Sequence, residues 1–345
     1  MEKRLVLRPV DKEDSASLLT LAQQASLGIV NLPKEEARLG HLIERSIRSF
    51  GFLEAEEGRS DGYYCFVLVD GKKMIGCSSI MGNCSLFAPL VTFKVERAPI
   101  VSVSTLLLAE PLYLLYLRER LYGASELCAL YLDPAYRHKK CAKLLSWGRF
   151  LFIAPFSRFF EERIMAEMRG VIDHDGRSPF WEAIGAPLLG CSFAAICSYL
   201  YRGEPFNFLS FFPATPLVWN CLSEEGRRAM GRMHPHTRAA FQLLFAQGFR
   251  FFQEVCWSDG GPLLSVAQQS IPAVSQSLLV PVEQIVDRLL PHEGFLALLA
   301  NERSDFRATQ AYVSLAAEAG CLQIDGGTAE ALCVSQGELV RCYRL

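Results

Sequence analysis

Apolar positions in the first third of the chain are spaced for a strand, two helices and a hairpin. RLVLRPV predicts a strand, and Asp11 is placed to cap a helix through DSASLLTLAQQA. Five apolar residues then recur at helical spacing: Leu39, Leu42, Ile43, Ile47 and Phe50. They predict an amphipathic helix opened by Pro33. The two strand-like runs of YYCFVLVDGKKMIGCSSIMG meet at Asp70-Gly71, which predicts a hairpin.

Strand-like runs and shorter helical segments alternate in the middle of the chain. VTFKVERAPIV and SELCALYLDP predict strands, and a helical pattern starts after the second of them. RIMAEMRGVI predicts another strand, SPFWEAIG a short helix, and CSFAAICSYL a further strand. From about Leu278, FLALLA, AYVSLAA and GELVRCYRL predict strands that complete the sheets.

Two segments of the chain share one layout. SPFWEAIGAPLLGCSFAAI and HTRAAFQLLFAQGFRFFQEV each hold a short helix with aromatic residues, a glycine that can end it, and a strand. The glycines are Gly185 and Gly248. This repetition predicts two similar halves.

Composition and charge narrow the class of protein. With 345 residues and 50 % apolar content, the chain can form two domains of ordinary size. A net charge of −2 argues against a general nucleic-acid binder, which would carry a basic domain. Glu110-Pro111 and Arg149 interrupt the longest apolar stretches, so neither provides the ~20 apolar residues of a membrane span. We therefore expect a soluble protein.

The twelve cysteines are scattered, with no CxxC pair and no secretory leader after MEKR. This pattern predicts reduced thiols that pack as small apolar side chains. It favours a cytoplasmic protein and no metal site.

A basic cluster stands at the start of the helix that follows SELCALYLDP. Asp133-Pro134 ends the strand, and the helical pattern begins after Arg137, His138, Lys139 and Lys140. Because the free amides of a helix N-terminus already carry partial positive charge, such a cluster predicts a small bound anion.

The order of elements and this loop resemble the GNAT acyltransferases, whose mixed sheet is splayed open to admit acyl-coenzyme A. In that family the fourth strand is followed by a loop of the pattern Gln/Arg-x-x-Gly-x-Gly/Ala. RHKKCA matches this pattern at Arg137 and Ala142. The resemblance implies that the loop, with Lys139, Lys140 and Cys141, binds the pyrophosphate of the coenzyme.

Lys140 departs from the family pattern, which has glycine at this position. A side chain forced into a left-handed backbone costs roughly 1–2 kcal/mol. A charge-assisted hydrogen bond from lysine to phosphate contributes about 1.5–3 kcal/mol. Because the two terms are comparable, the loop stays a candidate phosphate site, and a solvated basic loop without a ligand is the alternative.

Longer strings resemble the arginine N-succinyltransferases of bacterial arginine catabolism. They are NLPKEEARLGHLIERSIRSF, SELCALYLDP, AEMRGVIDHDGRSPFW, MHPHT and SDGGP, in this order. The resemblance implies an α+β chain of two GNAT-like halves, with mixed sheets flanked by helices and C-terminal strands that exchange between the halves. The expected halves are residues 1–205, which would bind acyl-CoA, and residues 206–345.

The same resemblance implies an enzyme that moves succinyl from succinyl-CoA to the α-amine of L-arginine. Succinyl-CoA would be a co-substrate, and no cofactor would be bound permanently. The expected partners are these small molecules, together with a second copy of the chain or a paralogous subunit. Nucleic acid and membrane are not expected.

His234 in MHPHT is the candidate catalytic residue, because it matches the family histidine described as the proton donor. Pro235 suits the first position of a helix that runs to about Ala246, which places His234 at its N-cap. The helix dipole there keeps the imidazole neutral at pH 7. The family contact to acyl-CoA falls on Leu130, which would act through its backbone.

Charge complementarity suggests binding residues for the two substrates. Glu167 and Arg169 are two apart on a predicted strand, so their side chains share a face. Arg169 could bind the free carboxylate of succinyl, and Glu167 could orient it or meet the amine. Asp173 and Asp175 in the next loop could receive the guanidinium of arginine. An ordinary salt bridge between Glu167 and Arg169 is the alternative.

Asp259-Gly260-Gly261-Pro262 predicts a turn, which the family match places near the active centre. Two further functions stay open on the sequence alone. One is an acyltransferase of the same build for another amine, such as ornithine, or another acyl-CoA. The other is a catalytically silent protein that binds coenzyme A or arginine, or assembles with an active paralogue.

Overall fold

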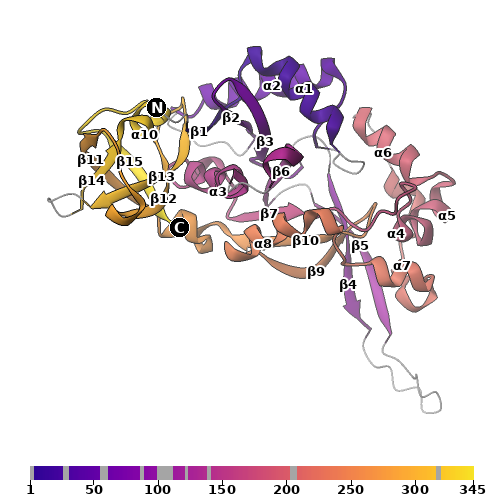
Figure 1. The fold of residues 1–345 in the computed structure, drawn as a ribbon. Helices are drawn as coiled ribbons and strands as arrows, with labels where there is room; N and C mark the ends of the chain where they lie inside the picture. Colours follow the sequence, from indigo (N-terminus) through magenta and orange to yellow (C-terminus); the bar gives the residue numbers. More distant parts are fainter. Residues whose placement is uncertain are drawn as a thin grey trace.

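The computed structural model describes residues 4–25, 31–54, 61–85, 89–98, 112–120, 123–137, 141–202, 208–315 and 320–345. The first elements follow the predicted order (Figure 1): β1 (Leu5–Pro9), α1 (Ser15–Gln24), α2 (Glu36–Gly51), β2 (Tyr63–Asp70) and β3 (Lys73–Met81). Gly71 has a φ of 62°, the left-handed conformation that a tight hairpin requires. The hairpin prediction is confirmed.

The strands and helices predicted for the middle of the chain are present, with one exception, alongside elements that were not predicted. They are β4 (Leu90–Arg97), β5 (Tyr113–Arg120), β6 (Ser125–Leu132), α3 (Cys141–Ile153), β7 (Arg163–Glu167), α4 (Pro179–Ala183), α5 (Gly185–Leu189) and α6 (Phe193–Arg202). The strand predicted for CSFAAICSYL is wrong, because this segment is the helix α6. Its buried residues Phe193, Ile196 and Cys197 have the spacing of one helical face, which a short apolar run does not separate from a strand.

The remaining elements include the predicted helix before Gly248, the strand after it and the three predicted C-terminal strands, together with elements that were not predicted. They are β8 (Leu217–Val218), α7 (Glu224–Ala229), α8 (Arg238–Ala246), β9 (Arg250–Cys256), β10 (Pro262–Ala267), α9 (Pro272–Ser275), β11 (Leu278–Val286), β12 (Phe295–Ala300), β13 (Ala308–Leu315), β14 (Leu322–Asp325), α10 (Gly326–Leu332) and β15 (Leu339–Arg344). Gly248 ends α8 with a φ of 86° before β9 starts.

The strands form one mixed sheet in the order β12-β15-β11-β14-β13-β1-β2-β3-β6-β7-β10-β9-β4-β5-β8. The β6–β7 and β11–β14 pairs are parallel. The expected α+β class with a mixed sheet is confirmed. Strands of both expected halves pair with one another, because β10 lies beside β7, and β4 lies beside β9. The boundary between residues 205 and 206 stays a prediction.

The five C-terminal strands close on themselves. They pair in the order β12-β15-β11-β14-β13, and β13 pairs back with β12. A ring of strands with its own buried core results, and α10 packs against it. Figure 1 shows this group at one end of the molecule. It joins the rest of the sheet through the pairing of β13 with β1 at Ala308 and Leu7.

Two apolar cores flank the central strands. Residues of α1 and α2 pack with one face of the sheet, and residues of α3 with the other. The α3 core also includes Phe306 from the loop before β13, whose ring contacts Phe66 at 5.7 Å and Phe152 at 5.2 Å between centroids. The C-terminal ring therefore shares a core with the central sheet.

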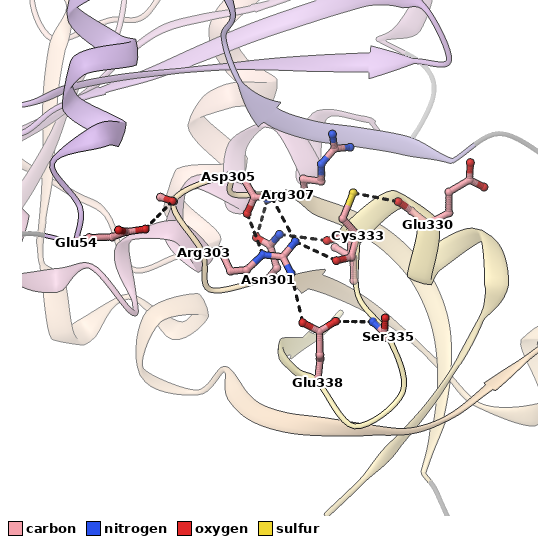
Figure 2. A network of polar contacts seen from close by, with 11 residues as sticks. Glu54, Asn301, Arg303, Asp305, Arg307, Glu330, Cys333, Ser335 and Glu338 are labelled. Atoms are coloured by element: carbon pink, nitrogen blue, oxygen red, sulfur yellow. Dashed lines mark hydrogen bonds and ion pairs between the residues drawn. The ribbon is translucent and has the colours of Figure 1, made fainter.

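Polar contacts fix the loop that joins β12 to β13 (Figure 2). The guanidinium of Arg303 donates to Asp305 (2.9 Å), to Glu338 (3.4 Å) and to the Cys333 carbonyl (2.9 Å). Ser304 Oγ donates to Glu54 after α2 across 3.1 Å. Since these groups are exposed, they orient the loop more than they stabilise the fold.

Candidate active site

The parallel strands β6 and β7 diverge soon after they pair. Their aligned residues are Ser125 with Ile164 and Glu126 with Met165. A cleft of about 160 Å³ is lined by the residues that follow on both strands, among others. From β6, β7 and the segment after it these are Glu126, Leu127, Cys128, Ala129, Leu130, Ala166, Glu167, Met168 and Arg169. This is the kind of opening that the GNAT resemblance implies.

A bulge interrupts β6 inside the cleft. Cys77 faces Tyr131 and Ser79 faces Cys128, so two residues of β6, Ala129 and Leu130, stand opposite one residue of β3. Ala129 has a φ of 50°, a left-handed conformation that is uncommon for alanine. A bulge leaves a residue outside the regular ladder, and such features cluster at functional sites. The structure places the predicted Leu130 backbone at this bulge.

Three carboxyl groups line the cleft: Glu126, Glu167 and Asp259. Glu126 is 4 % exposed, and burial and the neighbouring charge of Glu167 raise its pKa well above the ordinary value, although Asn31 donates a hydrogen bond to it. Burial and the charge of Asp259 raise the pKa of Glu167 to about 7. A pKa near neutral makes Glu167 a candidate acid-base group.

Asp259 connects the end of β7 to the β9–β10 turn. Its carboxylate accepts hydrogen bonds from the amides of Gly170 (2.7 Å) and Gly261 (2.8 Å), which partly offset the rise in pKa that burial causes. A Cβ atom at Gly261 would stand 1.9 Å from the Met168 carbonyl oxygen, so only glycine allows this approach. The predicted turn is confirmed, and the structure brings it into the cleft.

Arg169 is the predicted binding arginine, and it lines the cleft beside Asp259. Burial lowers the pKa of its guanidinium, and the charge of Asp259 acts in the opposite direction. Its Nε is buried and has no hydrogen-bond partner among the described residues. In the part of the chain that the structure describes, no ion pair joins Arg169 to Glu167.

An isolated antiparallel β-bridge pairs Gly170 with Met233. It brings the backbone of His234 next to that of Arg169. The His234 amide donates to the Arg169 carbonyl across 2.8 Å. The ring caps the turn at Pro235–Thr237 that leads into α8, with Nδ1 accepting from the His236 amide at 3.1 Å. Burial, then the charges of Arg169 and His236, lower the pKa of the imidazole. His234 is the N-cap of this short turn, whereas Thr237 is the N-cap of α8 itself. Thr237 lines the cleft, and His234 is not among the residues that line it.

The predicted phosphate loop is described in part. Arg137 is exposed, and its Nε donates to the Leu132 carbonyl across 3.2 Å. Cys141 is buried at the start of α3, and Ala142 packs against the same core. Lys139 and Lys140 lie outside the described residues. α3 starts at the end of this loop, and the role of the loop as a phosphate site stays a prediction.

Asp173 and Asp175 are not brought into the cleft lining. Asp173 accepts hydrogen bonds from the amides of Asp175 (3.0 Å) and Arg177 (2.8 Å), which shape the loop. Asp175 lies 3.3 Å from the ring of His174, and both side chains are exposed.

The pattern of the sequence did not identify Glu126 and Arg149 as site residues. Both are single charges inside apolar runs, SELCALYL and LLSWGRFLFI. A buried charge in an apolar element is itself a signal of function, since its burial is costly without a partner. The fold is needed to show that the two line one cleft.

Within the described ranges, no three or more His, Cys, Asp or Glu side chains are grouped to hold a metal ion. No helix in those ranges is both long and apolar enough to span a bilayer. All twelve cysteines are free thiols.

Two family models match the chain. The model described as arginine N-succinyltransferase beta subunit covers residues 5–273, and that of its C-terminal domain covers residues 279–344. The chain belongs to the arginine N-succinyltransferase family. The second match coincides with the closed C-terminal ring of strands.

Similar proteins cover the chain from end to end. The arginine N-succinyltransferase subunit beta of Pseudomonas aeruginosa is 36 % identical over 346 residues, which cover 99 % of this chain and 98 % of that protein. An arginine N-succinyltransferase of Yersinia pseudotuberculosis is 35 % identical over 348 residues, covering 98 % and 97 %. The solved structure of arginine/ornithine succinyltransferase subunit AI from Pseudomonas aeruginosa superposes with a TM-score of 0.87 at 28 % identity, covering 99 % of both chains.

As a member of the arginine N-succinyltransferase family, the chain is an enzyme, an acyltransferase that uses a coenzyme A thioester as co-substrate. The fold class implied by the resemblance is confirmed by the superposed structure. The word subunit in the names of two relatives refers to their assemblies.

Proposed function

We propose that this chain transfers the succinyl group of succinyl-CoA to the α-amine of L-arginine, in the cytoplasm. Family membership supports the reaction, and the free thiols fit a reducing compartment. The observation that carries the proposal is the β6 bulge at Leu130, which opens into a cleft with buried carboxyl groups and arginines.

The donor would enter from the start of α3. The loop of Arg137 to Ala142 would hold the diphosphate at the helix N-terminus, with Lys139, Lys140 and Cys141 between them. The thioester carbonyl would then lie at the Leu130 amide. This amide would stabilise the oxyanion that forms when the amine attacks.

Acid-base work would fall to Glu167 and His234. With a pKa of about 7, Glu167 can take up the proton that the attacking nitrogen releases. The Nδ1 of neutral His234 is an acceptor, so its ring proton lies on Nε2. That Nε2–H would donate to the departing sulfur as the carbon–nitrogen bond forms and the carbon–sulfur bond breaks. The thiolate of coenzyme A then gains a proton from solvent.

Two assignments complete the proposal. Arg169, with an unused Nε in the cleft, would bind the free carboxylate of succinyl. Asp173 and Asp175 would receive the guanidinium of arginine. They lie in the exposed loop after β7 and outside the cleft lining, so this second role stays a prediction.

A thiol-release assay with succinyl-CoA and a panel of amines tests the function. L-Arginine is expected to release free coenzyme A fastest. Faster release with L-ornithine would favour the alternative, an acyltransferase of the same build for another amine. The name of the superposed arginine/ornithine enzyme supports this alternative. Release with no pair of donor and amine would leave only the catalytically silent binding protein.

Assembly is part of the proposal. The relatives named as subunits support a homo-oligomer or a complex with a paralogous chain. Native mass spectrometry of the purified chain, alone and after co-expression with a paralogue, distinguishes these states. A strictly monomeric active enzyme would contradict both.

A further inference from the structure

Helix α3 carries an arginine in the core that the proposed mechanism does not use. Arg149 is 1 % exposed, and it nevertheless lines the cleft beside Leu127 to Leu130 of β6. A cationic side chain in such a place loses its hydration, which is costly unless an opposite charge or good hydrogen bonds compensate.

The present partners of Arg149 are all neutral. Its Nε donates to the Ser146 carbonyl (3.2 Å), one Nη to the Ser79 carbonyl (3.3 Å) and the other to Ser146 Oγ (3.4 Å). These distances exceed the usual 2.9–3.0 Å of such bonds. Among the described residues, no carboxylate forms an ion pair with Arg149.

Unused donors remain on this guanidinium. Three of the five N–H donors of an arginine are bonded here, so two have no acceptor in the described structure. The three bonds fix the side chain between α3 and β3 without neutralising it. Although burial lowers its pKa to about 10, Arg149 keeps its positive charge at neutral pH.

We propose that Arg149 is the receptor for a substrate carboxylate and makes the cleft selective for substrates that carry one. This inference rests on the proposed function. A buried, pre-oriented guanidinium with spare donors matches the planar geometry of a carboxylate. The two substrates offer two such groups, the free end of succinyl and the α-carboxylate of arginine. The cleft offers two guanidiniums, Arg149 and Arg169.

The test compares substrates that differ only in the carboxylate. Butyryl-CoA replaces succinyl-CoA on the donor side, and agmatine replaces L-arginine on the acceptor side. The purified full chain is measured as wild type, Arg149→Met and Arg149→Lys. Arg341→Met is the matched control. Arg341 of β15 is 14 % exposed in its side chain, pairs with Glu302 and lies outside the cleft lining.

Arg149→Met is expected to lower the preference for one carboxylate substrate over its analogue, measured as the ratio of kcat/KM values, by about 10- to 100-fold. A lower succinyl/butyryl ratio would show that Arg149 binds the carboxylate of the donor. A lower arginine/agmatine ratio would show that it binds the carboxylate of the acceptor. Arg341→Met should keep both ratios. If Arg149→Met slows all four substrates equally, Arg149 is a structural residue and the proposal fails.

Folding and the proposed function are controlled separately. Thermal melting shows whether Arg149→Met folds; if it does not, Arg149→Lys decides, because an ammonium lacks the planar fork and should still lower one ratio several-fold. If the wild type turns over none of the pairs, the proposed function fails by itself. Calorimetric binding of the same four compounds then decides: carboxylate-dependent affinity that Arg149→Met loses supports the receptor, and unchanged affinities overturn it.

Discussion

His234 is held through its backbone and its ring at the same time. The amide is bonded to Arg169, and the ring Nδ1 is bonded to the next turn, so only Nε2 is left to face a ligand. Burial and the charges of Arg169 and His236 lower the pKa of this ring, which favours its neutral form. We therefore assign it a hydrogen bond to the leaving sulfur rather than the storage of a proton.

Substitution of His234 separates these two roles. His234→Ala is expected to lower turnover at least ~100-fold with the fold intact. His234→Gln retains an N–H donor at a similar distance, so it should keep more activity than the alanine variant. Single-turnover kinetics with succinyl-CoA and L-arginine measures both. Near-normal turnover of His234→Ala would remove this residue from the mechanism.

Glu167 predicts the pH dependence of the reaction. Because the carboxylate must be deprotonated to accept a proton, kcat/KM should rise with pH and level off above about 7. Glu167→Gln should remove this rise together with most of the activity. A pH–rate profile from pH 5 to 9 measures both, and an unchanged profile in the variant would exclude Glu167 as the base.

The raised pKa of Glu167 also makes the stability of the fold depend on pH. Its folded pKa lies above its unfolded value, so the cost of ionising it is absent at pH 4 and complete above pH 7. The free energy of unfolding of Glu167→Gln, relative to that of the wild type, should therefore rise by about 1–3 kcal/mol between pH 5 and pH 8. Urea unfolding at the two pH values measures this difference.

Arg169 is the residue for which we expect an effect on donor choice. Arg169→Ala should raise the KM for succinyl-CoA more than that for acetyl-CoA, because only the succinyl group carries a free carboxylate. Initial rates with the two donors at saturating L-arginine provide the measurement. An equal change for both donors would refute this pocket role.

The residues of the site could be predicted from the sequence where a longer string carried them. His234, Glu167 and Arg169 come from MHPHT and AEMRG; Glu167 and Arg169 line the cleft, and the His234 amide donates to the Arg169 carbonyl. Glu126 and Arg149 could not be assigned, because a lone charge in an apolar run does not show what it faces. Their meaning depends on the packing of α3 against the sheet.

At the scale of elements, the cleft depends on how β6 departs from a regular strand. The bulge at Ala129 and the short pairing with β7 together open the sheet at Leu130. A regular β6 would continue the ladder and close this space. The local twist of one strand thus creates the binding site.

Substitutions of Ala129 test whether the bulge shapes the cleft. Ala129→Val places a β-branched side chain at a positive φ, which should cost more than about 1–2 kcal/mol and raise the KM for succinyl-CoA. Ala129→Gly accepts this backbone and should stay within about 1 kcal/mol of wild type. Chemical unfolding and steady-state kinetics measure the two effects. Equal behaviour of both variants would show that the backbone here is unstrained.

The type of several elements follows from the apolar pattern, and one element was assigned wrongly. β1, the β2–β3 hairpin, α2 and α8 have clear periods, caps or glycine stops, and their type was predictable. α6 was not, because its short run of apolar residues fits a strand as well as a helix. Packing in one core with Phe93, Leu115 and Trp257, which are distant in the sequence, determines the outcome.

At the scale of the whole molecule, the C-terminal ring and the central sheet share a core. Phe306 is 0 % exposed, and its ring packs against aromatic residues of β2 and α3. Two domains with separate cores would not need this residue. We therefore expect the described chain to unfold as one unit.

Phe306→Ala tests this coupling. Loss of the ring should cost ~3–5 kcal/mol and shift a single calorimetric transition to lower temperature. Leu332→Ala, inside the core of the ring of strands, should shift the same transition. Two transitions that respond separately to the two substitutions would show that the parts fold independently.

The sheet order itself was not predictable from the sequence. Two halves were expected from the repeated helix-glycine-strand layout, but nothing in VTFKVERAPIV indicates that β4 pairs with β9. The same holds for β13 and β1, since local patterns carry no information on which distant strand completes a sheet. These pairings follow from burial of the shared core.

The pairing of β1 with β13 has a consequence for synthesis in the cell. The hydroxyl of Thr309 donates to the Leu5 carbonyl, 304 positions earlier in the chain. At a synthesis rate of about 5–20 residues per second, β1 leaves the ribosome roughly 15–60 s before β13 has been made. During that interval one edge of the nascent sheet is open to pairing with other chains, so chaperone supply and translation speed should set the yield of soluble enzyme.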